Sequence, residues 1–110
     1  MVELGKQIND LDKVVHEPAR LGILTVLSAC EQADFVFLKR VTELSDGNLS
    51  AHLNKLESAG LVCIQKRFVG KKPQTLVWLT KSGHAQIKEH WRRLESLRVG
   101  ARQVIVERSS

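Results

Sequence analysis

The sequence predicts one mainly α-helical domain, residues 1–110, with a small β-hairpin, an α+β fold. Apolar residues recur at the spacing of amphipathic helices over most of the chain, which predicts helices. After Gly60 the period changes to 2 over "LVCIQKRFV" and "TLVWLT", which predicts two strands. A length of 110 residues is the size of about one domain, and no internal repeat or low-complexity segment indicates a second.

Two helices are predicted in the first third of the chain. The second begins at Pro18, which suits a first helical turn, and residues 19–30 are apolar nearly all round. That pattern is typical of a helix buried at the centre of a small domain. The first helix is predicted from four apolar residues at helical spacing, Leu4, Ile8, Leu11 and Val15.

A third helix is expected after the break at "EQAD". Residues 35–37 are interpreted as a short extended lead-in, and Leu38, Val41 and Leu44 as the inward side of the helix that follows. The next residues, "SDG", have the composition of a tight turn. The turn predicts that a fourth helix follows closely.

The stretch "SDGNLSAHLNKLESAGLV" carries the start and stop signals of this fourth helix. Ser45 or Asp46 can cap its first N–H groups, and Gly60 can take the left-handed conformation that ends it. Leu49, Leu53 and Leu56 form its inward stripe. The outward face carries no acidic side chain, unlike an ordinary solvated helix, and consists of Gly47, Ala51, Asn54 and Ser58.

The two predicted strands are joined by "VGKKPQ", a turn with Gly70 and Pro73 that carries two lysines at its tip. Phe68 and Trp78 of these strands are interpreted as packing the hairpin onto the helices rather than stacking on bases. Helical spacing then resumes after Thr80, a plausible cap, with the apolar residues Ile87, Trp91 and Leu94. Gly100 costs a helix about 1 kcal/mol. We therefore place this last helix at about residues 81–100, with Ala101 and Ile105 included if it continues past Gly100, and expect the tail to fray.

The order of elements predicts a winged helix-turn-helix, with the helix-turn-helix at about residues 36–60 and the wing at about 61–80. The fourth helix would then enter a major groove about 12 Å wide. On this basis the candidate DNA contacts of that helix are Asn48, Ser50, Ala51, Asn54 and Lys55. Those of the wing are Lys66, Arg67, Lys71 and Lys72, although a solvated hairpin that resists edge pairing would also be basic.

Three motifs carry a resemblance to known families. "LSAHLNKLESAGLV" resembles the recognition helix of arsenic-responsive and multiple-antibiotic-resistance type winged-helix regulators of prokaryotes. "LDKVVHEPARLGILTVL" and "LTKSGHAQI" resemble the same families' helix leading into the core and start of the last helix. The resemblance covers about residues 11–87. It implies that Ser50 and His52 contact DNA, whereas the helical spacing alone places His52 near the border of the core.

The charge distribution favours an anionic partner for the later part of the chain. The net charge is +5, yet residues 1–34 hold three basic and six acidic side chains and so carry −3. The remainder carries +8. A polarity of this kind is expected when one part of a small protein faces a polyanion and another part faces something else.

No metal, cofactor or enzymatic activity is predicted. The paired cysteines of metal-sensing relatives are missing from "FVFLKRVTEL", and His16, His84 and His90 are interpreted as surface or helix-end residues. Cys30 and Cys63 are isolated and are expected to be buried free thiols. Neither a nucleophile with an orienting base nor a phosphate-binding glycine loop is recognisable.

The function predicted from the sequence is a cytoplasmic, sequence-specific regulator that binds double-stranded DNA as a dimeric repressor. Apolar runs are too short to span a bilayer, and "MVELGKQINDLDK" is unlike a signal peptide. A small-molecule effector is compatible with the sequence, and a protein-binding adaptor without DNA binding is the alternative. The homodimer is expected to pair the terminal helices through Leu4, Ile8, Leu11, Val15, Ile87, Trp91 and Leu94.

Overall fold

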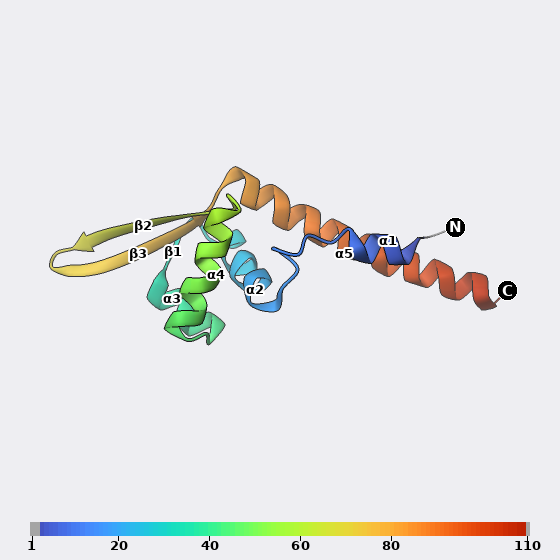
Figure 1. Cartoon of the computed structure of the whole chain (residues 1–110), viewed down its shortest axis with the longest axis horizontal. Coiled ribbons are helices and arrows are strands. Elements are labelled where there is room, and N and C mark those ends of the chain that lie inside the picture. Colours follow the sequence, from blue (N-terminus) through green and yellow to red (C-terminus); the bar gives the residue numbers. More distant parts are fainter. Residues whose placement is uncertain (1–2, 110) are drawn as a thin grey trace.

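The computed structural model describes residues 3–109 and confirms the predicted fold class. Helices α2, α3 and α4 form a compact group, a β-hairpin projects from one side of it, and α5 runs away from the other side (Figure 1). The elements in chain order are α1 (Leu4–Asn9), α2 (Pro18–Ser28), β1 (Ala33–Asp34), α3 (Phe35–Thr42), α4 (Asp46–Ser58), β2 (Val62–Val69), β3 (Lys72–Leu79) and α5 (Lys81–Ser109).

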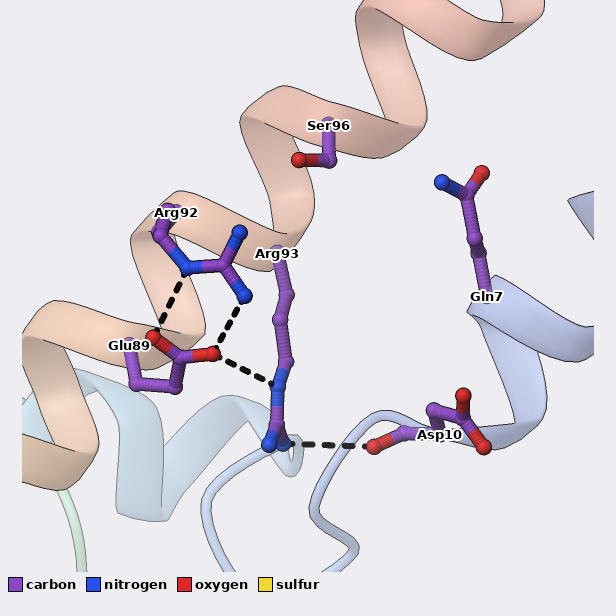
Figure 2. Close-up of a pocket in the computed structure, with 6 residues that line it drawn as sticks. All are labelled: Gln7, Asp10, Glu89, Arg92, Arg93 and Ser96. Atoms are coloured by element: carbon purple, nitrogen blue, oxygen red, sulfur yellow. Dashed lines mark hydrogen bonds and ion pairs between the residues drawn. The ribbon is translucent and has the colours of Figure 1, made fainter. Parts of the chain in front are cut away.

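The molecule is elongated, with extents of 68 × 25 × 20 Å and a radius of gyration of 17.4 Å. A compact chain of this length would have a radius of gyration of about 13 Å. The hairpin and the far half of α5 account for the difference (Figure 1). Helix α1 lies along α5, where the Arg93 guanidinium donates to the carbonyl oxygen of Asp10 at 3.2 Å (Figure 2). We refer to α1 and α5 together as the terminal arm.

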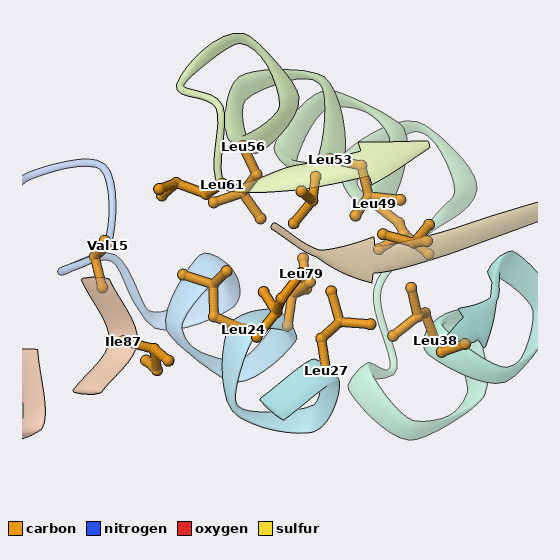
Figure 3. Packing of buried hydrophobic residues seen from close by; sticks show 14 residues of the cluster. Val15, Leu24, Leu27, Leu38, Leu49, Leu53, Leu56, Leu61, Leu79 and Ile87 are labelled. Carbon is orange, nitrogen blue, oxygen red and sulfur yellow. The ribbon is translucent and has the colours of Figure 1, made fainter. Parts of the chain in front are cut away.

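The core lies where α2, α3, α4 and the bases of the strands meet (Figure 3). The predicted inward residues of α4, namely Leu49, Leu53 and Leu56, are all at most 2% exposed. Burial of each such side chain contributes about 1.5–3 kcal/mol. The residues around them in the cluster are Val15, Ile23, Leu24, Leu27, Ala33, Leu38, Leu61, Val62, Val77, Leu79 and Ile87.

The sheet is antiparallel, with the order β1-β3-β2. In the hairpin, Val62 pairs with Leu79 and Val69 with Lys72, leaving a two-residue loop. Its first residue, Gly70, has φ +64°, as a type II′ turn requires. The extended segment before α3 is residues 33–34 rather than the predicted 35–37, because β1 pairs with β3 and the Asp34 carboxylate then caps the helix by accepting from the Phe37 N–H at 2.7 Å.

The junction between the hairpin and α5 is tightly packed. As predicted, Thr80 caps α5: its hydroxyl accepts from the Gly83 N–H at 2.9 Å. The same hydroxyl donates to the Gly60 carbonyl at 2.6 Å, which ties α5 to the end of α4. A Cβ added to Gly83 would lie 2.0 Å from the carbonyl oxygen of Leu61. Only glycine therefore allows α5 to start so close to the segment that follows α4.

The predicted helix through Leu4, Ile8, Leu11 and Val15 is wrong beyond Asn9. The Asp12 carboxylate accepts from the Val14 N–H at 2.8 Å, and such local bonds from Asp compete with a helix. The chain therefore leaves α1 and turns back to the core. Leu11 is 8% exposed and Val15 is fully buried, so neither forms an outward stripe.

Three other expectations need correction. Helix α5 continues through Gly100 to Ser109, because one glycine does not outweigh a long run of good helix formers with ion pairs such as Arg98–Glu95. Val41 is 44% exposed, whereas Leu38, which was also predicted to point inward, is fully buried. Cys30 and Cys63 are free thiols, but both are half-buried rather than buried.

Candidate nucleic-acid interface

Helix α4 is fixed at both ends. At its start the Ser45 hydroxyl accepts from the Asn48 N–H at 3.1 Å, so Ser45 rather than Asp46 is the cap. Asp46 instead forms an ion pair with Lys39 of α3, with 3.0 Å between carboxylate and ammonium. At its end Gly60 has φ +76°, as predicted for a left-handed stop. These contacts and the buried leucines hold the helix in one orientation.

The outward side of α4 presents short polar side chains to solvent. Of the six residues predicted to contact DNA on this helix, five are exposed. These side chains offer amide and hydroxyl groups that can donate and accept hydrogen bonds, together with one ammonium group. The five are Asn48, Ser50, Ala51, Asn54 and Lys55.

His52, the sixth, is placed differently. Its side chain is 23% exposed, and its Nδ1 lies 3.3 Å from the Arg20 guanidinium and 3.7 Å from the Glu17 carboxylate. Arg20 also donates to the carbonyl oxygen of Val14 at 2.6 Å. The cluster of Glu17, Arg20 and His52 thus attaches α4 to the start of α2. A DNA contact of His52 stays a prediction.

Glu17 is the residue around which this cluster is built. Its carboxylate accepts from the N–H groups of Arg20 at 2.8 Å and Ala19 at 3.2 Å, which caps α2. Burial alone would raise the pKa of Glu17, but these bonds and the nearby His52 and Arg20 lower it below its usual value. The carboxylate is therefore charged at neutral pH. Its place directly before Pro18 was the sequence signal for this cap.

The wing and α4 share one surface. Ile64, Lys66 and, across the hairpin, Thr75 line a hollow of about 380 Å³ together with Ser50 and Asn54 of α4. Alternate residues of a strand point to the same face, so Lys66 and the outward polar groups of α4 lie on one side of the molecule. We call this side the α4 face. The structure thus brings together Ser50, Asn54 and Lys66.

The other predicted wing residues are not on this hollow. Arg67 points to the opposite face, where its guanidinium donates to the Gln74 amide oxygen at 2.9 Å. Gln74 in turn donates to the Asp34 carboxylate at 3.5 Å. Lys71 and Lys72 are exposed at the end of the hairpin. Phe68, which was expected to pack the hairpin onto the helices, is instead 73% exposed.

The histidines and cysteines do not form a metal site. Within residues 3–109, no group of three or more His, Cys, Asp or Glu side chains is arranged to hold a metal ion. His16 and His84 are exposed as expected, but His90 is 1% exposed, which corrects its assignment to the surface. The correction follows from α5 packing against the segment that leaves α1, where His90 Nε2 meets His16 Nδ1 at 3.3 Å.

No helix of the described chain is both long and apolar enough to cross a membrane.

Known proteins share this architecture. The winged helix DNA-binding domain family matches residues 19–98. An uncharacterized protein from Methanocaldococcus jannaschii is 33% identical over 78 residues, 71% of this chain and 85% of that protein. A transcriptional regulator homologue from Pyrococcus horikoshii has a solved structure with 30% identity and a TM-score of 0.80, over 87% of this chain and 97% of that one.

A third similar structure is reduced AbfR bound to DNA, with 20% identity and a TM-score of 0.68, over 84% of this chain and 62% of that one. At this identity the likeness concerns the fold. The family match confirms the resemblance to winged-helix regulators that the motifs predicted. The chain therefore belongs to the winged helix DNA-binding domain family, which consists of DNA-binding regulators rather than enzymes.

Proposed function

We propose that this protein is a sequence-specific, dimeric transcriptional repressor that places α4 in the major groove of double-stranded DNA. The observation that carries the proposal is the shared surface of Ser50, Asn54 and Lys66, which puts two hydrogen-bonding side chains and a cation on the α4 face. Amide and hydroxyl groups read base edges, and ammonium groups contact phosphates. One surface therefore supplies both kinds of contact.

The wing extends the same contact along the DNA. An α-helix with its side chains is about 10–12 Å across and fits a major groove about 12 Å wide. With α4 in the groove, Lys66 would lie beside the backbone and the lysines at the hairpin end would reach the adjacent minor groove or its phosphates. Within residues 3–109, the ion pairs do not include Lys66, Lys71 or Lys72. Their charge remains available to phosphate.

The dimer contact is proposed on the terminal arm. Ile8 is 57% exposed, Trp91 46%, Val99 52% and Val106 66%, and exposed apolar residues gathered on one part of a protein often mark a contact with another protein. Leu4 and Leu94 are half-buried. Leu11, Val15 and Ile87 are buried in the monomer and leave the proposed contact. The dimer would therefore use Ile8 and Trp91 together with the two valines.

A two-fold dimer of this kind would present two copies of α4 to one side of the duplex. The two half-sites would then be about one helical turn apart, which predicts a palindromic operator. A dimer bound over a promoter excludes other proteins from the same DNA, so repression is the simplest regulatory outcome. The DNA-bound AbfR structure shows that a protein of this fold can be seated on DNA. A regulator of this kind would act in the cytoplasm, where a prokaryotic genome lies.

The decisive experiment is selection of bound fragments from a random pool of double-stranded DNA. Enrichment of a palindrome with half-sites about 10 base pairs apart is expected. The Asn54→Ala variant should lose the preference at defined positions, while Asn9→Ala, which removes an exposed asparagine on α1, serves as the matched control. A pool with no enriched sequence would contradict the proposal and favour the protein-binding adaptor.

A further inference from the structure

The wing carries an exposed aromatic residue that the contacts proposed so far leave unused. Phe68 is 73% exposed and its neighbour Val69 is 56% exposed. Single exposed apolar residues are ordinary on protein surfaces. Phe68 differs because exposed basic residues surround it on a hairpin that projects away from the core, namely Lys66, Arg67, Lys71 and Lys72 (Figure 1).

The position of Phe68 on the hairpin places it on the α4 face. It follows Ile64 and Lys66 at two-residue intervals along β2, and these two line the hollow shared with α4. Each interval advances about 6.8 Å along the strand, so Phe68 lies about 7 Å beyond Lys66, toward the hairpin end. Its cross-strand partner is Pro73, which is also exposed. Phe68 and Pro73 thus form an apolar pair next to Lys66 on the α4 face, the side that is proposed to meet DNA.

We propose that Phe68 is a wedge that enters the minor groove next to the half-site and partly unstacks one base step. The inference rests on the proposed DNA binding and adds a second mode of recognition to it. Phenylalanine is among the side chains that proteins insert between base steps from the minor groove. The exposed lysines beside it, Lys66 and Lys71, supply the positive charge that holds such a side chain against a polyanion.

The wedge also predicts a type of sequence preference that hydrogen bonds do not supply. Unstacking costs least at pyrimidine–purine steps such as TA and CA/TG. The preferred site should therefore contain such a step in the minor groove on the outer side of each half-site, where no α4 side chain reaches. The duplex should be bent there toward the major groove.

The test uses the selected duplex with 2-aminopurine placed in turn at the outer steps. Wild-type protein and Phe68→Leu, which keeps a wedge, should raise its fluorescence on binding at one step. Phe68→Ala should abolish the rise and weaken binding about tenfold, as expected when one buried phenylalanine is lost. Val69→Ala, on the opposite face of the same strand, is the matched control and should behave as wild type.

Two outcomes would overturn the proposal. Tight, sequence-specific binding with no fluorescence change, and with Phe68→Ala equal to wild type, would remove the wedge while leaving the DNA-binding function intact. A Phe68 that instead mediates contact with protein would give the same DNA result together with weaker self-association of the variant in sedimentation. Failure of the wild type to select any DNA would overturn both proposals. Because Phe68 is exposed, Phe68→Ala should keep the wild-type melting temperature, which checks that it folds.

Discussion

The α4 face and the terminal arm are both exposed helical surfaces, but they differ in chemistry. The α4 face offers short polar groups and lysines without acidic partners among the described residues. The arm offers large apolar groups, and three of its arginines are paired within α5: Arg92 and Arg93 with Glu89 at 2.5 and 3.3 Å, and Arg98 with Glu95 at 2.6 Å. The first surface suits a polyanion and the second suits another protein.

The pKa values express the same contrast. Hydrogen bonds from Arg92 lower the pKa of Glu89 to about 2, and the same kind of bond from Arg98 lowers the pKa of Glu95. These arginines are therefore matched by charged carboxylates at neutral pH. Net basic composition therefore says little about where DNA would bind, whereas Lys66, Lys71 and Lys72 form no ion pair among residues 3–109 and leave the charge of the wing available.

The largest expected effect is on the salt dependence of DNA binding. A dimer that neutralises about 6–10 phosphates should lose roughly a thousandfold or more in affinity between 50 and 200 mM salt. Replacing Lys71 and Lys72 together by Ala should flatten the slope of log affinity against log salt while keeping sequence preference. Replacing Lys6 and Lys13, which lie outside the α4 face, makes the same change in charge. A titration in which both double variants keep the wild-type slope would show that the wing does not contact phosphates.

The next largest effect is expected on dimerisation through the terminal arm. Trp91→Glu places a charge in the proposed dimer contact and should yield monomers at tens of micromolar in light scattering. DNA affinity should fall by about a hundredfold or more, because two linked half-sites gain at least that factor over one. Ala85→Glu, an exposed residue elsewhere on α5, controls for the added charge. If wild-type protein itself scatters as a monomer, the arm is not the dimer contact.

A smaller effect separates reading of bases from binding of phosphates on α4. Ser50→Ala or Asn54→Ala should each cost about 1–3 kcal/mol on the selected site and much less on random DNA. Competition binding with both DNAs measures the difference. Equal losses on the two DNAs would assign these side chains to phosphate contacts. His52→Ala should lower the melting temperature as well, since its ring joins α4 to Glu17 and Arg20.

The smallest effect concerns the base of the arm and its dependence on pH. Burial, and then the nearby His16, lowers the pKa of His90 below its usual value near 6.5, opposed by Asp12 and reinforced by Arg93. The unfolded chain then binds a proton at a higher pH than the folded one, so stability is full above that range and falls as the pH drops through about 6.5.

Urea unfolding at pH 5.5 and 7.5 measures how much the free energy of unfolding changes with pH in this range. His90→Gln should reduce the difference in unfolding free energy between the two pH values, and the exposed His84→Gln should leave it unchanged. Glu17 also makes stability depend on pH. Because the pKa of its carboxylate is lowered, the stability that it contributes is lost only below about pH 4.5, outside the two measured pH values. An unchanged difference in His90→Gln would show that His90 is not the group that titrates.

The sequence predicted correctly those parts of the fold in which a pattern within one helix determines which of its residues are buried. Leu49, Leu53 and Leu56 follow a helical repeat, and the structure buries all three. Ser45, Gly60 and Thr80 act locally as helix caps or stops, and all three were predicted correctly. In each case the signal and its structural consequence lie within a few residues.

The errors occur where burial depends on a distant element. His90 is buried because the chain after α1 returns to meet it, and a pattern along α5 alone cannot show this. Phe68 alternates correctly for a strand, but its exposure depends on how far the hairpin extends beyond α4. Helical spacing places His52 near the border of the core, as the structure does, but its cluster partners Glu17 and Arg20 come from a segment 32 or more residues earlier, so no pattern along α4 could predict them.

Because Gly83 is in tight contact with Leu61 at the start of α5, a small change there would displace the far end of the terminal arm by a larger distance. Helix α5 is 29 residues long, about 43 Å, and its direction is set within one turn of the point where it touches the segment after α4. A rotation of α5 by about 5° at the Gly83–Leu61 contact would move its far end by roughly 4 Å. In a dimer joined through the arms, the same rotation would change the spacing of the two α4 helices. In such a dimer, the half-site spacing would depend in part on the Leu61 carbonyl group, which has room beside it only for the hydrogen atom of Gly83.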